Sequence, residues 1–578
     1  MADTNQKLAA IFQQMADIVE ITGGNRFRAI SFQTTARRLI ELAEDVAELD
    51  LPTLTGIEGI GKGTAQRIRE FIETGRIEEH HRLLADVPPD LLKLLDIPGL
   101  GPKTVAVLWQ QAGVKSMNEL KSAIDSGKLL NLPGFGQKKI DNIKKNLAFA
   151  AQASKRFRIG SALPLAQWFV QQLRKLKQVK QAAYAGSIRR GKETIGDIDI
   201  LVAADTKDAA TISDAFVKQE VVDQVIASGE TKTTVRTRQG IQVDLRIVPP
   251  ESFGAALMYF TGSKDHNVRM RERAIAMGLK LNEYGLYKQD SDELVTGETE
   301  QDVFKAMSLQ WIPPELRLDR GELMLAERYK LPALIELNDI KAELHTHTNA
   351  SDGVWNIREL AAAAADRGFH TVAITDHSKG QAQANGLSPE RLEKHIQAVH
   401  EVAAKMKNTI AVLAGTEVDI LVDGKLDYPN SLLKACDIVI ASVHSALSQD
   451  PATCTKRLLK AINNQYITIL GHPTGRIVNK REGLHPDMKK LFKAANQRGI
   501  AMELNANHYR LDLRDAHARA AIDAGVKLSI NTDAHGPADL DELKYGLYTA
   551  RRAGATKDDV VNCMSRSDLS KWIQSTRP

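Results

Sequence analysis

The chain has 578 residues, 43% of them hydrophobic, which is more than one hydrophobic core usually organises, so we expect several domains. Its net charge of +5 is too small to indicate a partner, and its three cysteines are too scattered for a CxxC zinc or redox motif. No apolar run approaches the roughly 20 residues needed to span a bilayer, and we find no secretory signal at the N-terminus. These features argue against a disulfide scaffold and predict a cytoplasmic protein without membrane contact.

Positive charge is concentrated in one part of the chain. Between Gly101 and Lys192 there are 18 Lys or Arg and 3 Asp or Glu, a local net charge of +15. A solvated helix face can carry basic residues, but a stretch this long and one-sided indicates a polyanionic partner, because each phosphate contact releases condensed counterions. Charge alone does not distinguish a nucleic acid from another polyanion.

Residues 5–50 show apolar residues at helical spacing, and three similar segments follow them at Leu54–Ile68, Leu94–Leu108 and Leu129–Ile143. Each segment has an apolar residue, then a Gly-x-Gly turn, then an amphipathic helix. Glycine permits a tight turn and a close approach, and the first N–H groups of the helix are free to bind an anion. The repeat predicts helix-hairpin-helix motifs that bind DNA phosphates without reading bases. The expected contacts are Gly59, Gly61, Gly99, Gly101, Lys103, Gly134, Gly136 and Lys138.

Short apolar strands follow between residues 182 and 248, with one helical stretch at 209–219, which predicts a mixed α/β unit. Asp197 and Asp199 lie two residues apart on one of these strands, so both carboxylates project from the same face. Such carboxylates repel each other unless a cation lies between them, and Mg²⁺ prefers oxygen ligands. Asp244 on another strand would complete a trio able to hold two ions, one activating a hydroxyl and one stabilising pyrophosphate. Without the preceding Gly-Ser, a DxD pair on a strand would more often mark a surface edge or a single ion site.

Strands and helices alternate beyond Lys341, with helices expected at 358–367 and 388–407, which predicts a βα barrel. Nine His, Asp and Glu residues close successive strands, and packing does not explain them because buried unpaired polar groups cost free energy. Strand ends converge at one mouth of such a barrel. Imidazole and carboxylate ligands suit Mn²⁺, Zn²⁺ or Fe²⁺, and two or three such ions can make hydroxide and hold a phosphate. The expected ligands are His345, His347, Asp352, His377, Glu417, His444, His472, Asp533 and His535.

Residues 1–318 resemble DNA polymerase β and its bacterial family X relatives. The resemblance is carried by GSIRRGKETIGDID at 186–199, VDLR at 243–246 and YFTGSKDHNVRMR at 259–271, in that order behind the hairpin motifs. It implies that Asp197 and Asp199 bind both of two Mg²⁺ or Mn²⁺ ions, and that Asp244 binds the catalytic ion beside the primer 3′-hydroxyl.

The same resemblance implies a nucleotide pocket. Ser187 and Arg190 would hold the triphosphate, consistent with bidentate guanidinium–phosphate geometry. Tyr259 and its neighbours would exclude the sugar 2′-hydroxyl, and Asn267 with Arg271 would contact the nascent pair and the template minor groove. The full expected set is Gly186, Ser187, Arg190, Gly196, Tyr259, Phe260, Gly262, Asn267 and Arg271.

One position departs from that family. In polymerase β-like lyase domains, a lysine in the helix after the first hairpin forms a Schiff base with an abasic sugar. The matching position is Arg67, and a nearby supporting lysine is replaced by Gly63. Arginine stays protonated and cannot act as that amine, and Lys62 is out of register. We therefore expect no efficient lyase, with the DNA-binding role retained.

Residues 339–578 resemble the PHP (polymerase and histidinol phosphatase) domain, and all nine of that family's ligand positions are filled. Behind a family X polymerase, this resemblance implies a Mn²⁺-dependent 3′-5′ exonuclease, with abasic (AP) endonuclease or 3′-phosphatase activity. Two other readings stay open. One is a DNA-binding repair scaffold with vestigial centres, and the other is a small-molecule phosphatase like histidinol phosphatase, to which DNA binding is incidental.

The expected protein is a bacterial, nucleoid-associated, monomeric repair polymerase that takes gapped or primed double-stranded DNA and deoxynucleoside triphosphates. Its fold class is multidomain, α+β and α/β. The predicted order is an N-terminal helical domain with a helix-hairpin-helix (1–90), fingers with helix-hairpin-helix motifs (91–150), a nucleotidyltransferase palm (151–248), a thumb (249–325), a linker (326–338) and a PHP domain with a distorted βα barrel (339–578).

Overall fold

The computed structural model describes residues 2–41, 46–57, 59–97, 100–137, 139–141, 143–144, 147, 156–229 and 231–578. Its contacts divide the chain into two units, Met1–Ser154 with Asn479–Arg481, and Lys155–Val478 with Glu482–Pro578. Among the described helices, none is long and apolar enough to cross a membrane.

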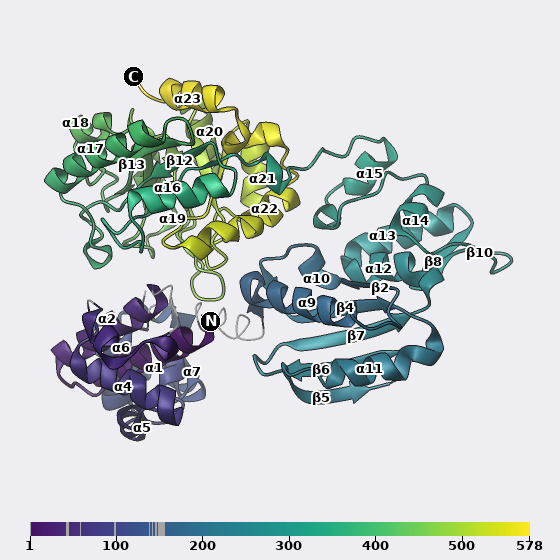
Figure 1. The fold of residues 1–578 in the computed structure, drawn as a ribbon, viewed down its shortest axis with the longest axis horizontal. Helices are drawn as coiled ribbons and strands as arrows, with labels where there is room; N and C mark the ends of the chain where they lie inside the picture. The colour runs from purple at the N-terminus through teal and green to yellow at the C-terminus, as the bar shows by residue number, and fades with distance from the viewer. Residues whose placement is uncertain are drawn as a thin grey trace. The chain divides into compact units, whose positions relative to one another are not determined.

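The first unit is helical, as the spacing of its apolar residues predicts (Figure 1). One hydrophobic core joins its helices, and includes Phe12, Leu39, Ile68 and Leu108, all fully buried. Helices follow the first two Gly-x-Gly turns directly, beginning at Lys62 and Pro102. The described helices are α1 (Ala2–Ile21), α2 (Arg26–Glu41), α3 (Leu51–Gly56), α4 (Lys62–Thr74), α5 (Glu78–Ala85), α6 (Pro102–Ala112) and α7 (Met117–Asp125).

The second unit begins with the predicted mixed α/β part, a five-stranded sheet in the order β2-β4-β7-β6-β5. Ile200 and Val202 face one hydrophobic cluster and Leu201 and Ala203 face another, because successive side chains of a strand point to opposite faces. The elements are β1 (Phe157–Arg158), α9 (Ile159–Leu173), β2 (Gln181–Tyr184), α10 (Gly186–Arg189), β3 (Thr194–Ile195), β4 (Asp197–Ala203), α11 (Ala209–Val217), β5 (Val222–Ser228), β6 (Lys232–Thr237) and β7 (Gln242–Val248).

Helices and a small antiparallel sheet follow up to residue 327 and enclose a separate core that includes Met270 and Phe304. The first of these helices, α12, packs on the Leu201–Ala203 face of the palm sheet. The elements are α12 (Phe253–Thr261), α13 (Lys264–Ala276), β8 (Leu279–Asn282), β9 (Gly285–Lys288), β10 (Leu294–Thr296), α14 (Glu300–Ala306) and α15 (Glu322–Glu327).

The segment predicted as a linker, residues 326–338, packs against the C-terminal part of the same unit. Ala326 still belongs to α15, and Ile335 is fully buried. The backbone N–H of Ile335 donates to the carbonyl of Ala555 at 3.0 Å, and its own carbonyl accepts from Arg551 at 2.8 Å. The two sides of this segment therefore belong to one unit.

Seven parallel strands, β11 to β17, lie side by side in chain order and confirm the predicted βα barrel. A parallel bridge between Thr346 and Ala534 joins the segments that follow the first and last strands. The strands are β11 (Ala342–Glu343), β12 (Thr371–Ile374), β13 (Ala411–Asp419), β14 (Ile438–Ser442), β15 (Ile469–Leu470), β16 (Ala501–Asn505) and β17 (Leu528–Asn531).

Helices lie between these strands and after them (Figure 1). The two helices predicted at 358–367 and 388–407 are confirmed to within one residue at each end. The helices are α16 (Ile357–Asp366), α17 (Pro389–Met406), α18 (Asn430–Ala435), α19 (Pro451–Ile462), α20 (Met488–Arg498), α21 (Asp515–Asp523), α22 (Leu543–Arg552) and α23 (Arg566–Ser575).

Candidate active sites

Three carboxylates meet on the palm sheet. Asp199 on β4 is the register partner of Asp244 on the parallel strand β7, and Asp197 shares the face of Asp199. Burial, together with the charges of Asp197 and Asp244, raises the pKa of Asp199 from 3.8 to about 6. The sheet therefore brings the predicted trio together and makes a cation favourable there. Among the described residues, the oxygens of these three carboxylates do not form a group in which all lie within 4.8 Å of one another.

Two further side chains contact the buried carboxylate of Asp244. Lys232 on β6 places its Nζ 2.7 Å from Oδ2, and Gln242 donates to Oδ1 at 3.1 Å. Sequence reasoning missed both residues. The sequence does indicate that Gln242 lies near Asp244, since it precedes Asp244 by two positions on the same strand and so shares its face. Lys232 lies on a separate strand, and only the sheet order brings it to the site.

The turn after β2 approaches the carboxylates closely. Gly186 has φ +62°, and a Cβ there would lie 2.3 Å from Oδ2 of Asp199, so this position requires glycine. Arg190 follows on the same turn and donates to the carbonyl of Thr261 at the end of α12. Burial lowers the pKa of Arg190 to about 10, which leaves it cationic at neutral pH. Ser187 is half-buried on this turn, and Gly196 immediately precedes Asp197.

The predicted sugar-facing residues cluster beside the same turn. The rings of Tyr259 and Phe260 meet edge to face with their centroids 5.1 Å apart. Gly262 adopts φ +69°, where a Cβ would lie 3.0 Å from Nη1 of Arg190. Asn267 donates to the carbonyl of Tyr259 at 2.7 Å, whereas Arg271 is exposed on α13. The structure thus brings together this set, with Arg271 at its edge.

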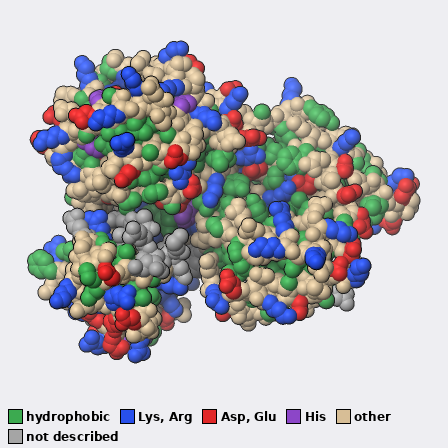
Figure 2. Space-filling view, in the orientation of Figure 1, with side chains coloured by type: hydrophobic (Ala, Val, Ile, Leu, Met, Phe, Trp, Pro, Cys, Tyr) green, Lys and Arg blue, Asp and Glu red, His purple; other side chains and the backbone are tan. Residues whose placement is uncertain are grey.

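The hairpin glycines have the backbone that anion binding needs. Gly59 and Gly134 adopt φ +88° and +77°, and Gly61 and Gly101 begin α4 and α6 without a side-chain cap, so their first N–H groups are available. On the face shown in Figure 2, Lys and Arg side chains are scattered among acidic ones. The remaining expected contacts are exposed Lys103 and Gly136, while Gly99 and Lys138 lie outside the described residues.

Arg67, at the lyase lysine position, is held by neighbouring groups. Its Nε pairs with Glu79, which also pairs with Arg28. Its Nη1 donates to the carbonyl of Gly63 at 2.8 Å, and its guanidinium lies over the ring of Phe32. Lys62 is exposed at the start of α4. Arg67 therefore has a structural role in the first unit.

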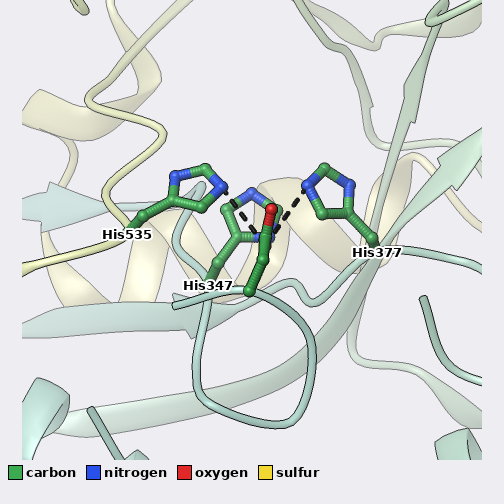
Figure 3. A group of neighbouring side chains, drawn as sticks. His347, His377 and His535 are labelled. Atoms are coloured by element: carbon green, nitrogen blue, oxygen red, sulfur yellow. Dashed lines mark ion pairs between the residues drawn. The ribbon is translucent and has the colours of Figure 1, made fainter. Parts of the chain in front are cut away.

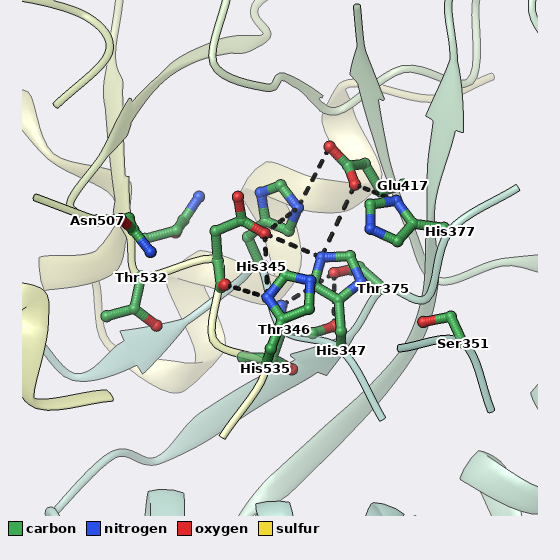
Figure 4. A network of polar contacts seen from close by, with 12 residues as sticks. His345, Thr346, His347, Ser351, Thr375, His377, Glu417, Asn507, Thr532 and His535 are labelled. Atoms are coloured by element: carbon green, nitrogen blue, oxygen red, sulfur yellow. Dashed lines mark hydrogen bonds and ion pairs between the residues drawn. The ribbon is translucent and has the colours of Figure 1, made fainter. Parts of the chain in front are cut away.

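The nine expected metal ligands converge at the C-terminal ends of the barrel strands. Glu417 is central, because its carboxylate oxygens lie 2.7 Å from His377 Nδ1 (Figure 4) and 2.8 Å from His472 Nε2. Asp352 Oδ1 lies 3.3 Å from His535 and 3.6 Å from His377, whose rings both point inward toward His347 (Figure 3). Three sets have ligand atoms within 4.8 Å of one another: His347, Asp352, His377 and His535; His345, His347 and Asp533; and His377, Glu417 and His444.

The donor set fits metal ions. Burial, with the neighbouring rings of His377 and His535, lowers the pKa of His347 to about 4, so this imidazole is neutral, which is the form that binds metals. Neighbouring carboxylates outweigh burial and raise the pKa of His444 to about 9 and that of His535 to about 10, so metal binding there would release protons. Buried polar atoms normally have partners, yet several ring nitrogens at this mouth make no hydrogen bond. They are Nε2 of His345 and His444 and Nδ1 of His347 and His472.

Sequence reasoning missed the groups that orient the ligands. Glu503 accepts from Nδ1 of His345 at 2.7 Å and from the backbone N–H of His472 at 2.6 Å. Asp419 lies 2.5 Å from Nδ1 of His444. Such partners fix the orientation of a metal-binding imidazole. Asp419 had a signal, because it follows Glu417 by two positions on β13.

A second missed group comes from a helix. Buried His395 on α17, which carries no motif, lies 2.8 Å from Asp376. The Asp376 carboxylate also accepts from the hydroxyl groups of Thr348 and Ser351. These contacts fix the loop between His347 and Asp352.

Comparisons with known proteins agree with this geometry. Family models match a helix-hairpin-helix domain at 3–77, a SAM-like helix-hairpin-helix tandem at 91–148, the DNA polymerase beta palm at 163–246, the DNA polymerase beta thumb at 256–318 and a PHP domain at 343–507. The class is therefore a family X polymerase joined to a PHP domain.

Sequence identity to individual proteins shows which family within this class the chain belongs to. The chain is 37% identical to "DNA polymerase/3′-5′ exonuclease PolX" of Bacillus subtilis over 567 residues, which cover 98% of each chain. It is 30% identical to a "Probable phosphatase" of Thermoanaerobacter over 38% of this chain and 89% of that one. It is 25% identical to "DNA polymerase lambda" of Rattus norvegicus, over 51% and 53% of the two chains. The chain belongs to the PolX family of bacterial family X polymerases.

Proposed function

We propose that the chain fills short gaps during bacterial DNA repair and trims 3′ ends with its PHP domain. Membership of the PolX family makes it a DNA-directed DNA polymerase with a 3′-5′ exonuclease, acting on DNA and deoxynucleoside triphosphates with divalent metal ions. The observation that carries the polymerase role is the convergence of Asp197, Asp199 and Asp244 beside the turn of Gly186.

In the polymerase centre, Asp197, Asp199 and Asp244 would hold two Mg²⁺ or Mn²⁺ ions. When bound, such ions supply positive charge to the primer 3′-hydroxyl and to the departing pyrophosphate. The chain's own contribution is positioning. Ser187 and Arg190 bind the triphosphate, because a guanidinium matches the geometry of phosphate oxygens, and the glycine at 186 lets their turn reach the carboxylates.

Beside that turn, Tyr259 and Phe260 close the sugar side, and Asn267 holds the carbonyl of Tyr259 in place. Arg271, on the exposed side of α13, contacts the template minor groove. The hairpin turns bind DNA phosphates through their free N–H groups.

In the PHP centre, the nine ligands would hold up to three ions, and Mn²⁺, Zn²⁺ and iron all suit this donor set. When bound, such ions supply a hydroxide at neutral pH and charge against a phosphate. Glu503 and Asp419 keep His345 and His444 oriented. Mn²⁺-dependent removal of 3′ nucleotides is the proposed main reaction, with AP endonuclease or 3′-phosphatase activity at the same ligands.

The deciding experiment is a time course on a gapped duplex with Mn²⁺. With all four nucleotides the primer should lengthen, and without them it should shorten from its 3′ end. A chain that binds the gapped DNA but does neither would be the repair scaffold. A chain that cleaves histidinol phosphate faster than DNA would be the small-molecule phosphatase.

The cellular setting is also part of the proposal. We infer a monomer of the bacterial cytoplasm that works at the nucleoid without a membrane. The local charge of +15 between Gly101 and Lys192 and the hairpin turns support DNA as the partner. The domain limits predicted from the sequence, including the linker at 326–338, stay predictions.

A further inference from the structure

The PHP part touches the turn that carries Ser187 and Arg190 in the polymerase centre. This turn comprises the short helix α10 (Gly186–Arg189) and the residues up to Lys192, and Gly191 in it accepts a hydrogen bond from Arg552 on α22 of the barrel. Residues at the end of a turn usually face water. Here they face a charged and aromatic surface of the PHP domain.

Arg552 is the main contact. It is buried on α22, and its Nη1 donates a hydrogen bond to the carbonyl of Gly191. Its Nε lies 3.5 Å from the carboxylate of Asp515. A guanidinium is costly to bury unless its N–H groups and its charge have partners. The Gly191 carbonyl is one of these partners, so moving the turn would leave a buried donor unsatisfied.

The ring of Tyr548, also on α22, contacts Gly191 from one side. Gly191 adopts φ +61°, and a Cβ there would lie 2.5 Å from Cδ1 of the Tyr548 ring. The ring therefore lies directly against the backbone of the turn. Tyr548 and Tyr184, on the strand that leads into the turn, both pack against the palm core. The PHP domain thus contacts the turn where it ends and packs with the strand where it begins.

A second loop from the barrel holds the strand that follows. Arg476 makes two hydrogen bonds to the carboxylate of Glu193, at 2.6 and 3.1 Å, and lies four residues after the expected ligand His472. Glu193 is followed by β3 and then by Gly196 and Asp197. The PHP domain therefore fixes both the end of the turn and the approach to the carboxylate strand.

The rest of the turn is held from other directions. The carbonyl of Asp199 accepts from the N–H of Ala185 at 2.8 Å, and Arg189 makes a two-point pair with Glu300 at 2.7 and 2.8 Å. Arg190 donates to the carbonyl of Thr261. Palm, thumb and PHP parts thus each hold one side of a short turn.

We propose that Arg552 and Tyr548 are positioning residues for nucleotide binding, which keep Ser187 and Arg190 in reach of the triphosphate. The proposal rests on the assignment of Ser187 and Arg190 as triphosphate contacts. A misplacement of about 1 Å can cost a large factor in an enzyme reaction. The polymerase centre is therefore completed by residues that belong to the other catalytic domain.

The test uses the full chain with Arg552→Met and Tyr548→Ala, and Tyr548→Phe as the matched control that keeps the ring. Single-nucleotide addition to a one-nucleotide gap gives KM for the nucleotide and kcat. Both test variants should raise KM about tenfold with a smaller change in kcat, and Tyr548→Phe should stay within twofold of wild type. In Arg552→Met, Asp515 and Glu193 keep Arg320 and Arg476 as partners, which favours folding.

Folding is monitored by the thermal melting temperature and by Mn²⁺-dependent degradation of single-stranded DNA, which should stay within twofold. If Arg552→Met does not fold, the KM of Tyr548→Ala alone tests the proposal. An unchanged KM in the folded variants, or a fall in kcat with unchanged KM, overturns the proposal. Arg190→Ala is measured in parallel. If its KM is also normal, the assignment of the turn to the triphosphate is wrong. If Arg190→Ala alone raises KM, only the role of the PHP residues is wrong.

Discussion

Asp199 and Asp244 are register partners on two parallel strands, and the charge of Asp244 adds to the burial that raises the pKa of Asp199. A cation bound between two such carboxylates would reduce their repulsion. The first two predictions follow from this pair.

Replacing Asp197 and Asp199 with Ala should abolish nucleotide addition, because the ions lose two of their three expected protein ligands. DNA binding should remain, since the hairpin turns bind phosphates without these carboxylates. Primer extension and a gel-shift assay measure the two properties. Asp214→Ala, an exposed carboxylate on α11, is the matched control and should extend normally. Near-normal extension by the double variant would disprove the assignment.

Asp199 also predicts a pH dependence of stability in EDTA. Its folded-state pKa of about 6 exceeds the ordinary 3.8, so the folded chain binds this proton more tightly than the unfolded chain does. Stability then falls as pH rises from about 4 to about 6, and the full penalty, at most about 3 kcal/mol, persists above that range.

Asp199→Asn should therefore melt at a higher temperature than wild type at pH 7.5, with about half of that gain in free energy at pH 5. Added Mg²⁺ should stabilise wild type more than the variant. Differential scanning fluorimetry measures both effects. A gain in stability that does not depend on pH would show that ionisation of Asp199 does not destabilise the fold.

Tyr259 should control the choice of sugar. It lies at the end of α12 beside Gly262 and Arg190, where its ring or carbonyl can exclude a 2′-hydroxyl. Tyr259→Ala should change the ratio of deoxynucleotide to ribonucleotide incorporation in single-turnover assays. Tyr284→Ala, an exposed tyrosine, should not change it. An unchanged ratio in Tyr259→Ala would assign sugar selection to other residues.

Borohydride trapping on a 5′-deoxyribose phosphate end should be weak. Arg67 stays protonated and is engaged by Glu79 and Gly63, so it offers no amine for a Schiff base. The measurement is the yield of covalent protein–DNA adduct on a denaturing gel. Strong trapping that disappears in Lys62→Ala would make Lys62 the nucleophile and our register wrong.

Replacing His345 and His347 with Ala should lower 3′-end degradation by on the order of 100-fold or more, because the metal cluster loses ligands. Polymerisation should survive, since its proposed carboxylates lie on the palm sheet and not at the mouth of the barrel. Net extension should even rise as degradation stops competing. His400→Ala, exposed on α17, is the control. Intact degradation in the double variant would place the nuclease elsewhere.

Local patterns were enough to predict the barrel and the convergence of the nine expected ligands at its mouth. His345 and Asp533 follow apolar strands, and parallel strands of a barrel bring their ends to one mouth, so these two side chains meet although 188 positions separate them. Alternation along a single strand likewise predicts that the carboxylates of Asp197 and Asp199 share one face. The helices at 358–367 and 388–407 followed from their apolar spacing alone.

Contacts between domains were beyond such reasoning. Arg552 and Gly191 are 361 positions apart, and neither belongs to a repeat or a strand end that predicts a partner. Lys232 at Asp244 required the order of the strands, which alternation does not give. His395 carries no motif, and its role appears only through its contact with Asp376. The burial of Ile335, within the segment predicted as a linker at 326–338, is likewise visible only in the structure.

The palm core contains Leu511 and Tyr545, two side chains from the barrel that pack with Ile200 and Val243. A ribosome completes the palm strands long before it makes these residues. At common rates of synthesis the delay for roughly 300 residues is about 15 to 60 seconds. During that time part of the palm's apolar surface lacks its cover in the nascent chain. The polymerase half thus reaches its final packing only at the end of translation, and a truncated chain would keep that surface bare.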